Sequence, residues 1–88
     1  MPGAVRKRKD LAGGPLITGS SDVFVNGAAM VRKNDLVASH GKKPHSGLVK
    51  MVQGSATVFC NGRPACKKGN LASCGHKATG SFDVFIEG

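Results

Sequence analysis

The segment Gly54-Ser55-Ala56-Thr57-Val58-Phe59-Cys60-Asn61-Gly62 decides the fold, because the chain contains its pattern three times. Residues 19–27 read GSSDVFVNG, at an offset of 35 positions, and residues 80–88 read GSFDVFIEG. The pattern GSxxVFxxG recurs with too many identities for chance. Such recurrence indicates one supersecondary unit that is used several times.

Each copy alternates apolar and polar side chains in the way that is typical of a short β-strand. Val58 and Cys60 point to one face, and Phe59 points to the other. The Asn-Gly pair that ends the first two copies indicates a two-residue hairpin, because a type I′ turn needs a positive φ at both positions. The return strand of the second copy is expected at residues 63–66, where its proline marks an edge or a bend.

The third copy ends the chain without a return strand of its own. Pairing this last strand with the first repeat would remove an exposed edge and close the repeats into a ring. No helical periodicity of useful length occurs in the sequence. We therefore expect an all-β fold: a small stack of short hairpins with pseudo-threefold repeats.

The length and charge of the chain limit its class. Eighty-eight residues allow one small domain, which would bury only about 60–65% of its unfolded surface, so a metal, partner or oligomer is expected to support it. We divide the chain into a basic, flexible N-terminal arm at 1–9 and a single domain at 10–88. A net charge of +8 suits nucleic acid or an acidic protein partner.

The sequence shows neither a membrane span nor a secretory signal. The sequence has no run of 18 apolar residues, so no transmembrane helix is expected. The basic N-terminus is not followed by an apolar stretch, which argues against a secretory signal. We expect the protein to be made in a bacterial cytoplasm.

All three histidines and one of the three cysteines lie in two connections, 38–52 and 73–79, which follow the equivalent residues Leu36 and Leu71. By the logic of the repeat, both connections should emerge at the same end of the body. Three His and one Cys have the ligand types and number of a closed tetrahedral zinc site. The alternative is that surface histidines and a small buried cysteine merely fall in loops. The four candidate ligands are His40, His45, Cys74 and His76.

The repeats and their return strands resemble the PAAR-repeat proteins, which are named after a Pro-Ala-Ala-Arg tetrad that follows the turn. The best copy of the tetrad here is Pro64-Ala65-Cys66-Lys67, and the first copy reads Ala29-Met30-Val31-Arg32. The Gly-Asp pair that usually follows is represented by Asn34-Asp35 and Gly69-Asn70. The resemblance covers roughly residues 10–88.

The resemblance implies a sharp cone that caps the distal end of a trimeric β-helical spike, in a type VI secretion system or at the tip of a contractile phage tail. It also implies one zinc ion near the apex, bound by three His and one Cys. Many members carry one of these histidines near the N-terminus, but the matching segment 9–14 has none. His40, His45 and Cys74 sit where the family's motif places ligands, and His76 is the obvious replacement for the missing one.

We therefore expect a non-enzymatic, metal-stabilised tip that binds one spike trimer per monomer and helps to pierce the target envelope. A transient contact with the target membrane is expected, and a small-molecule substrate is not. With four protein ligands the zinc has no open position, which is typical of a structural site. The competing hypothesis is a small zinc-stapled nucleic-acid-binding module. Against it, Phe24, Phe59 and Phe85 recur at one equivalent position, which we interpret as packing between repeats.

Overall fold

The computed structural model describes residues 2–39, 41, 49–81 and 84–86. Within these residues the chain is all-β, which confirms the predicted class, and it holds no helix that could cross a membrane. Short antiparallel strands form four two-stranded sheets. They pair β1 (Leu11–Ala12) with β2 (Gly14–Pro15), β3 (Phe24–Val25) with β4 (Ala28–Ala29), β5 (Leu36–Val37) with β6 (Val49–Lys50), and β7 (Phe59–Cys60) with β8 (Arg63–Pro64).

The two Asn-Gly turns form as predicted. Asn26 and Gly27 have φ angles of 51° and 81°, and Asn61 and Gly62 have angles of 54° and 77°. Two consecutive positive angles are what a type I′ hairpin requires, and Asn and Gly tolerate them better than other residues. The sequence therefore fixes both β3–β4 and β7–β8 at their turns.

The third copy of the repeat finds its return strand at the other end of the chain. The backbone N–H of Ala4 donates to the carbonyl of Val84 at 2.9 Å, and that of Ile86 donates to Pro2 at 2.8 Å. The ring of repeats is thus closed by the N-terminal segment. The bonds in the other two units that correspond to Ala4–Val84 run from Met30 to Val23 and from Ala65 to Val58, each at 2.9 Å.

This closure corrects the expectation that residues 1–9 form a flexible arm. Ala4 and Val5 are fully buried. The backbone N–H of Arg8 donates to the carbonyl of Leu16 at 2.8 Å, and Arg6 forms a β-bridge with Met30. The described part of the segment is built into the body because its apolar Ala-Val pair belongs to the core. The boundary predicted at residue 10 does not mark the edge of the packed region.

Three backbone hydrogen bonds tie the units together at the middle of the body. Val31 donates to Val5 at 3.0 Å, Cys66 donates to Val31 at 2.9 Å, and Val5 donates to Cys66 at 3.1 Å. The three residues, which we call the central ring, have no exposed surface. Each N–H at this depth needs a partner, and the cyclic arrangement provides one for all three without a continuous sheet.

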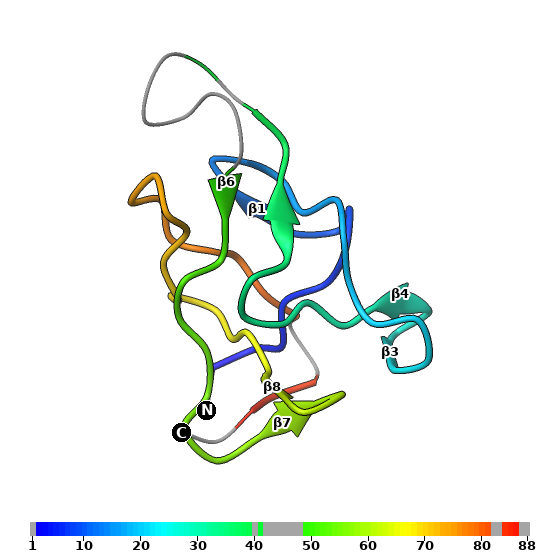
Figure 1. Cartoon of the computed structure of the whole chain (residues 1–88). Coiled ribbons are helices and arrows are strands. Elements are labelled where there is room, and N and C mark those ends of the chain that lie inside the picture. The colour runs from blue at the N-terminus through cyan, green and yellow to red at the C-terminus, as the bar shows by residue number, and fades with distance from the viewer. Residues whose placement is uncertain (1, 40, 42–48, 82–83, 87–88) are drawn as a thin grey trace.

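The central ring lies between two ends, and the body measures 32 × 24 × 23 Å. The hairpin end carries β3–β4, β7–β8 and the paired residues 2–4 and 84–86 (Figure 1). Its core cluster has six buried members, two from each unit: Ala4, Met30 and Ala65, with Val25, Cys60 and Ile86. The loop end carries β1–β2 and β5–β6 at the top of Figure 1, and it has the larger cluster of buried residues.

Candidate functional site

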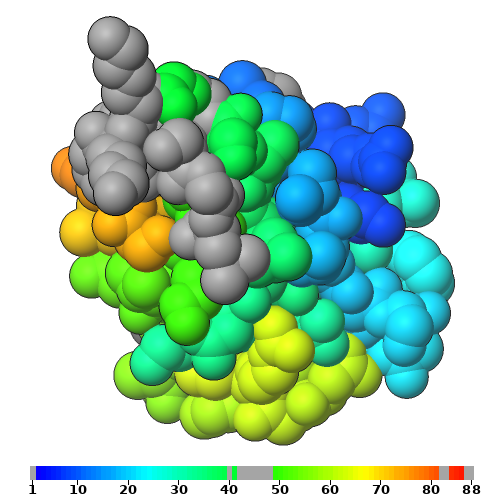
Figure 2. Space-filling model, turned by 45° about the horizontal axis from the view of Figure 1, so that its top comes forward, coloured from blue at the N-terminus to red at the C-terminus, as the bar shows by residue number. Residues whose placement is uncertain are grey.

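The loop end is where three connections leave the body. Their stems are the paired residues Leu11–Pro15, Leu36–Lys50 and Leu71–Lys77. Neighbouring stems are bonded to each other: Ile17 donates to Leu36, Val52 to Leu71 and Thr79 to Leu11, at 2.9, 3.0 and 2.9 Å. Figure 2 shows the three parts of the chain adjoining at this end, in blue, green and orange. The stems of the two His-bearing connections therefore lie at the same end, as the repeat predicted.

Cys74 lies under this end of the molecule. Its side chain is 8% exposed and belongs to the larger core cluster. Nine members of that cluster occupy equivalent positions of the three units, with three in each unit. The remaining two are Val49 and Cys74. The loop that carries Cys74 is held against β6, because the N–H of Ser73 donates to the carbonyl of Lys50 at 2.7 Å.

His76 follows Cys74 after a tight turn. The N–H of Gly75 donates to the carbonyl of Ala72, and the N–H of Ala72 donates to the carbonyl of His76, both at 2.9 Å. Gly75 has a φ of 93°, which only glycine adopts at little cost. His76 is exposed, so this turn presents one buried thiol and one accessible imidazole.

The other two predicted ligands, His40 and His45, lie outside the described residues. Within the described part of the chain, no three side chains of ligating type come together. The attachment points of the two histidines are nevertheless defined. His40 is three residues after Val37 and His45 is four before Val49, so an extended chain reaches at most about 10 and 14 Å from these stems.

The four predicted ligands have the chemistry of a zinc site, and their convergence stays a prediction. Imidazole nitrogen and thiolate are the ligands that structural zinc sites use. Val37 and Val49, the residues that flank the His-bearing loop, pack in the same core cluster as Cys74. The third connection, Ala12 to Gly14, supplies no ligating side chain, which is the consequence of the histidine missing from segment 9–14.

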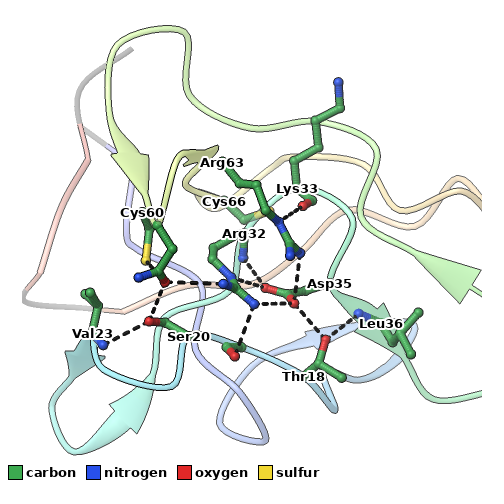
Figure 3. Close-up of polar contacts among 12 residues, drawn as sticks. Thr18, Ser20, Val23, Arg32, Lys33, Asp35, Leu36, Cys60, Arg63 and Cys66 are labelled. Carbon is green, nitrogen blue, oxygen red and sulfur yellow. Dashed lines mark hydrogen bonds and ion pairs between the residues drawn. The ribbon is translucent and has the colours of Figure 1, made fainter.

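A buried carboxylate stabilises the turn that leads from the central ring to the loop end. Asp35, 3% exposed, accepts hydrogen bonds from Arg32 at 2.9 and 3.0 Å, from Arg63 at 3.1 Å and from Thr18 at 2.8 Å (Figure 3). Burial opposes ionisation of this carboxyl. The hydrogen bonds from Arg32 and Thr18 outweigh burial, so the pKa of Asp35 lies below its ordinary value.

The same turn in the N-terminal unit uses Asp10. Its carboxylate accepts from Arg6 at 2.8 and 3.1 Å and from Thr79 at 2.8 Å. Burial again raises the pKa of Asp10 and these hydrogen bonds lower it, with a net decrease. The third unit has Asn70 at this position, and its side-chain oxygen accepts from the backbone of Lys67 at 2.8 Å. Both carboxylates are engaged in fixing turns.

The two cysteines away from the loop end are parts of the core. Cys60 is 3% exposed on β7 and Cys66 is fully buried in the central ring. Burial raises the pKa of the Cys66 thiol to about 12. A thiol that stays protonated at neutral pH is a poor nucleophile and a poor metal ligand. Cys74 is therefore the cysteine whose placement suits a metal.

The hairpin end presents a feature that the sequence interpretation missed. Phe24, Phe59 and Phe85 are 59%, 58% and 49% exposed. Our expectation that they pack between repeats is wrong, because Val25, Cys60 and Ile86 fill the interior and direct the phenylalanines to the other face of each short strand. The strict alternation of the strand was the signal that could have found them.

The family of the chain follows from its sequence match. A family model described as the PAAR motif matches residues 8–80. The chain belongs to the PAAR-motif family. PAAR-motif proteins are structural components of phage-tail or secretion spikes and associate with spike proteins. The match stops short of residues 2–7, which supply the third return strand. No curated protein matches the chain significantly.

Proposed function

We propose that this PAAR-motif protein is the non-enzymatic tip of a contractile injection machine, either a phage tail baseplate or a type VI secretion spike. It caps and sharpens a trimeric β-helical spike and helps it to pierce the target envelope. The observation that carries the proposal is the exposure of Phe24, Phe59 and Phe85, one from each unit, at the hairpin end. Exposed aromatic side chains of this size are typical of protein interfaces.

Symmetry explains why three units would be kept in one chain. Equivalent backbone bonds recur in all three units, as in the central ring and in the donations of Ser20 to Met30, Ser55 to Ala65 and Ser81 to Ala4, each at 2.8 Å. In the proposal these units form a pseudo-threefold cone with the hairpin end as its base. Each unit then meets one chain of a true threefold partner, so a single copy caps the trimer.

In the proposal the loop end is the apex, and one zinc ion stabilises it. His40, His45, Cys74 and His76 would hold the ion, and they would close its coordination shell without water. Zinc bound only to the folded state adds folding free energy and restrains local opening of the two loops. A tip under mechanical load benefits because forced unfolding depends on the unfolding rate.

The competing nucleic-acid hypothesis is weakened by the placement of aromatic and basic residues. Single-strand binders combine stacking aromatics with cations that follow the backbone. Here the segment from Val23 to Val31, which carries Phe24, contains no Lys or Arg. Arg63, which pairs with Cys60 in the second hairpin, is engaged with Asp35. Within their own hairpins, Phe24 and Phe59 therefore have no unengaged cation, which suits a protein partner better.

The proposal is tested by binding to the trimeric β-helical spike protein encoded nearest to this chain. The variant Phe24→Ser/Phe59→Ser should retain its fold and lose co-purification with the trimer. The matched control Leu11→Ser/Ile17→Ser, which removes exposed apolar side chains near the loop end, should bind as the parent does. Loss of binding in the control alone would show that the spike docks elsewhere.

A further inference from the structure

A band of exposed aliphatic side chains surrounds the loop end, separate from the phenylalanines and from the predicted metal ligands. Leu11, Ile17 and Val52 are 50%, 38% and 39% exposed. Leu36 and Leu71 are half-buried, and the stem bonds place Leu36 beside Ile17 and Leu71 beside Val52. We call these five residues the aliphatic collar. It carries apolar surface on all three sides of the body.

Basic residues border the collar in each unit. The turns that carry them are bonded to the strands of the collar: Arg8 donates to Leu16, Asn34 to Met51 and Gly69 to Ala78, at 2.8, 2.8 and 2.9 Å. On their other side these turns join the hairpin end, because Lys7 donates to Ala29, Lys33 to Pro64 and Lys68 to Gly3. The cations therefore lie between the collar and the hairpin end on every side. The residues of this basic belt are Lys7, Arg8, Lys9, Lys33, Lys67 and Lys68.

The belt is not neutralised within the described part of the chain. The salt bridges there engage Arg6, Arg32 and Arg63, none of which belongs to the belt. Their acidic partners, Asp10 and Asp35, are buried. The other three acids of the sequence fall within the GSxxVFxxG copies, at Asp22, Asp83 and Glu87. Positive charge therefore accumulates beside the collar.

We propose that the collar and the belt together bind an anionic lipid surface. The aliphatic side chains enter the boundary between headgroups and acyl chains, and the belt cations contact the lipid phosphates, which is how interfacial proteins combine the two forces. A cationic band on all sides matches the annulus of headgroups around a body that enters a membrane end-on. A nucleic acid would need cations along one groove and gains nothing from an aliphatic collar.

The dimensions of the body place this contact at one face of a membrane. Its long axis is 32 Å, whereas a bilayer with its headgroups is about 40–45 Å thick. The body is therefore too short to span a bilayer with its headgroups in any orientation. This inference deepens the proposed function and rests on its assignment of the loop end as the end that meets the envelope. Its failure can be told from failure of spike binding, because the two assays use different residues and different partners.

The test measures co-sedimentation of the protein with vesicles of phosphatidylcholine alone and of phosphatidylcholine with roughly one third phosphatidylglycerol, at moderate salt. The parent should bind the anionic vesicles and not the zwitterionic ones. The variant Lys33→Gln/Lys68→Gln should bind them about 25-fold more weakly, because each basic residue near an anionic surface contributes roughly fivefold. Leu11→Ser/Ile17→Ser should also weaken binding.

The matched control is Ser21→Glu/Ala56→Glu, which lowers the net charge equally at exposed, equivalent positions of the hairpin end. It should change vesicle binding by less than about threefold, since a localised belt rather than net charge is responsible. An equal loss in both double variants would overturn the proposal. The proposal would also be overturned if Leu11→Ser/Ile17→Ser bound the anionic vesicles as tightly as the parent, and the parent bound a short DNA duplex more tightly than the vesicles at the same salt. Phe24→Ser/Phe59→Ser should keep vesicle binding even where spike binding is lost.

Discussion

The hairpin end and the loop end are built from the same three units, yet they have diverged to different degrees. At the hairpin end, each unit keeps a phenylalanine on the surface and an apolar residue beneath it. At the loop end, the segments between the stem residues run from 12 to 14, from 37 to 49 and from 72 to 76. Repetition persists where the proposed partner is threefold. The loop end contacts no threefold partner in the proposal, so its three connections can differ and can form one asymmetric metal site.

The largest expected effect is a loss of thermal stability, and it compares a cysteine at the loop end with one at the hairpin end. Cys74→Ser should lower the melting temperature by more than about 15 °C, because it removes a ligand of the proposed zinc. Elemental analysis of protein purified without added metal should find about one zinc per chain in the parent and far less in the variant. Scanning calorimetry with and without a chelator provides the stability measurement.

Cys60→Ser is the matched control, since Cys60 is also buried but lies at the hairpin end. It should keep its zinc and lose only packing energy. If Cys60→Ser and Cys74→Ser are equally destabilised and both parent and variants lack zinc, the proposed metal centre is wrong.

A smaller effect is expected midway between the two ends, at the buried carboxylate. Asp35→Ala should reduce the free energy of unfolding by about 3–5 kcal/mol, because it leaves the buried part of Arg32 without its partner. Denaturant unfolding of the variant measures this change. Asp22→Ala at the hairpin end is the control, since its carboxyl is exposed, and its effect should be small.

The dependence of stability on pH follows from the same carboxylates. The folded-state pKa values of Asp10 and Asp35 lie below 3.8, the value for the unfolded chain. Their stabilising contribution is therefore present above that pH and is lost as the pH falls through the lower, folded-state values. Melting temperatures measured from about pH 5 to pH 2 should fall steeply in the parent and less steeply in Asp35→Ala. Parallel slopes would contradict this assignment.

A further prediction concerns the N-terminal unit that closes the ring. A Cβ added at Gly3 would collide with the backbone of Ser81, whereas one added at Gly27 meets nothing within 4 Å. Gly3→Ala should cost about 1–3 kcal/mol through displacement of the closing contact. Gly27→Ala should cost about 1 kcal/mol, through its positive φ alone. Urea unfolding that ranks Gly27→Ala as the more damaging would show that the closure does not contribute to stability.

The sequence predicted those parts of the fold in which a residue type is tied to one backbone geometry. Asn26-Gly27 and Asn61-Gly62 specify their turns because few other residues accept consecutive positive φ angles. The common end of the loops followed from the equivalence of Leu36 and Leu71. In both cases a local rule was sufficient.

The N-terminal unit was missed because it is displaced to the opposite end of the chain from the strand that it completes. Its signal was present: Val5-Arg6-Lys7 repeats Val31-Arg32-Lys33, and Asp10-Leu11 repeats Asp35-Leu36. Two residues separate Lys7 from Asp10, but only one separates Lys33 from Asp35, so a comparison at one constant offset does not align both matches. The basic composition then favoured a solvated arm, although Ala4 and Val5 are buried.

The exposure of the phenylalanines was missed because their hydrophobicity was taken as a sign of packing, although the alternation of the strand places Phe59 on the face opposite Cys60. Of the predicted metal ligands, the structure defines Cys74 and His76. Cys74 is buried at the loop end and His76 is exposed. The zinc site remains a prediction that rests on the stems of the loops and on the chemistry of the four side chains.

The smallest expected effect on stability distinguishes interface residues from core residues at the hairpin end. Phe24→Ser should change the free energy of unfolding by less than about 0.5 kcal/mol, because most of this side chain is already exposed. Val25→Ser, one residue later and 3% exposed, should cost several times more. Chemical denaturation of the two variants compares them directly. A large loss of unfolding free energy in Phe24→Ser would indicate that the phenylalanine packs within the monomer and is not an interface residue.

The central claim is that three units in one chain meet three chains of one spike. Native mass spectrometry of the complex with the trimeric spike protein tests it most directly. We predict a complex of one tip and three spike chains, with no further binding at excess tip, because a single pseudo-threefold base occupies the whole threefold end. Three tips per trimer, or no complex at concentrations at which both proteins are folded, would contradict the account.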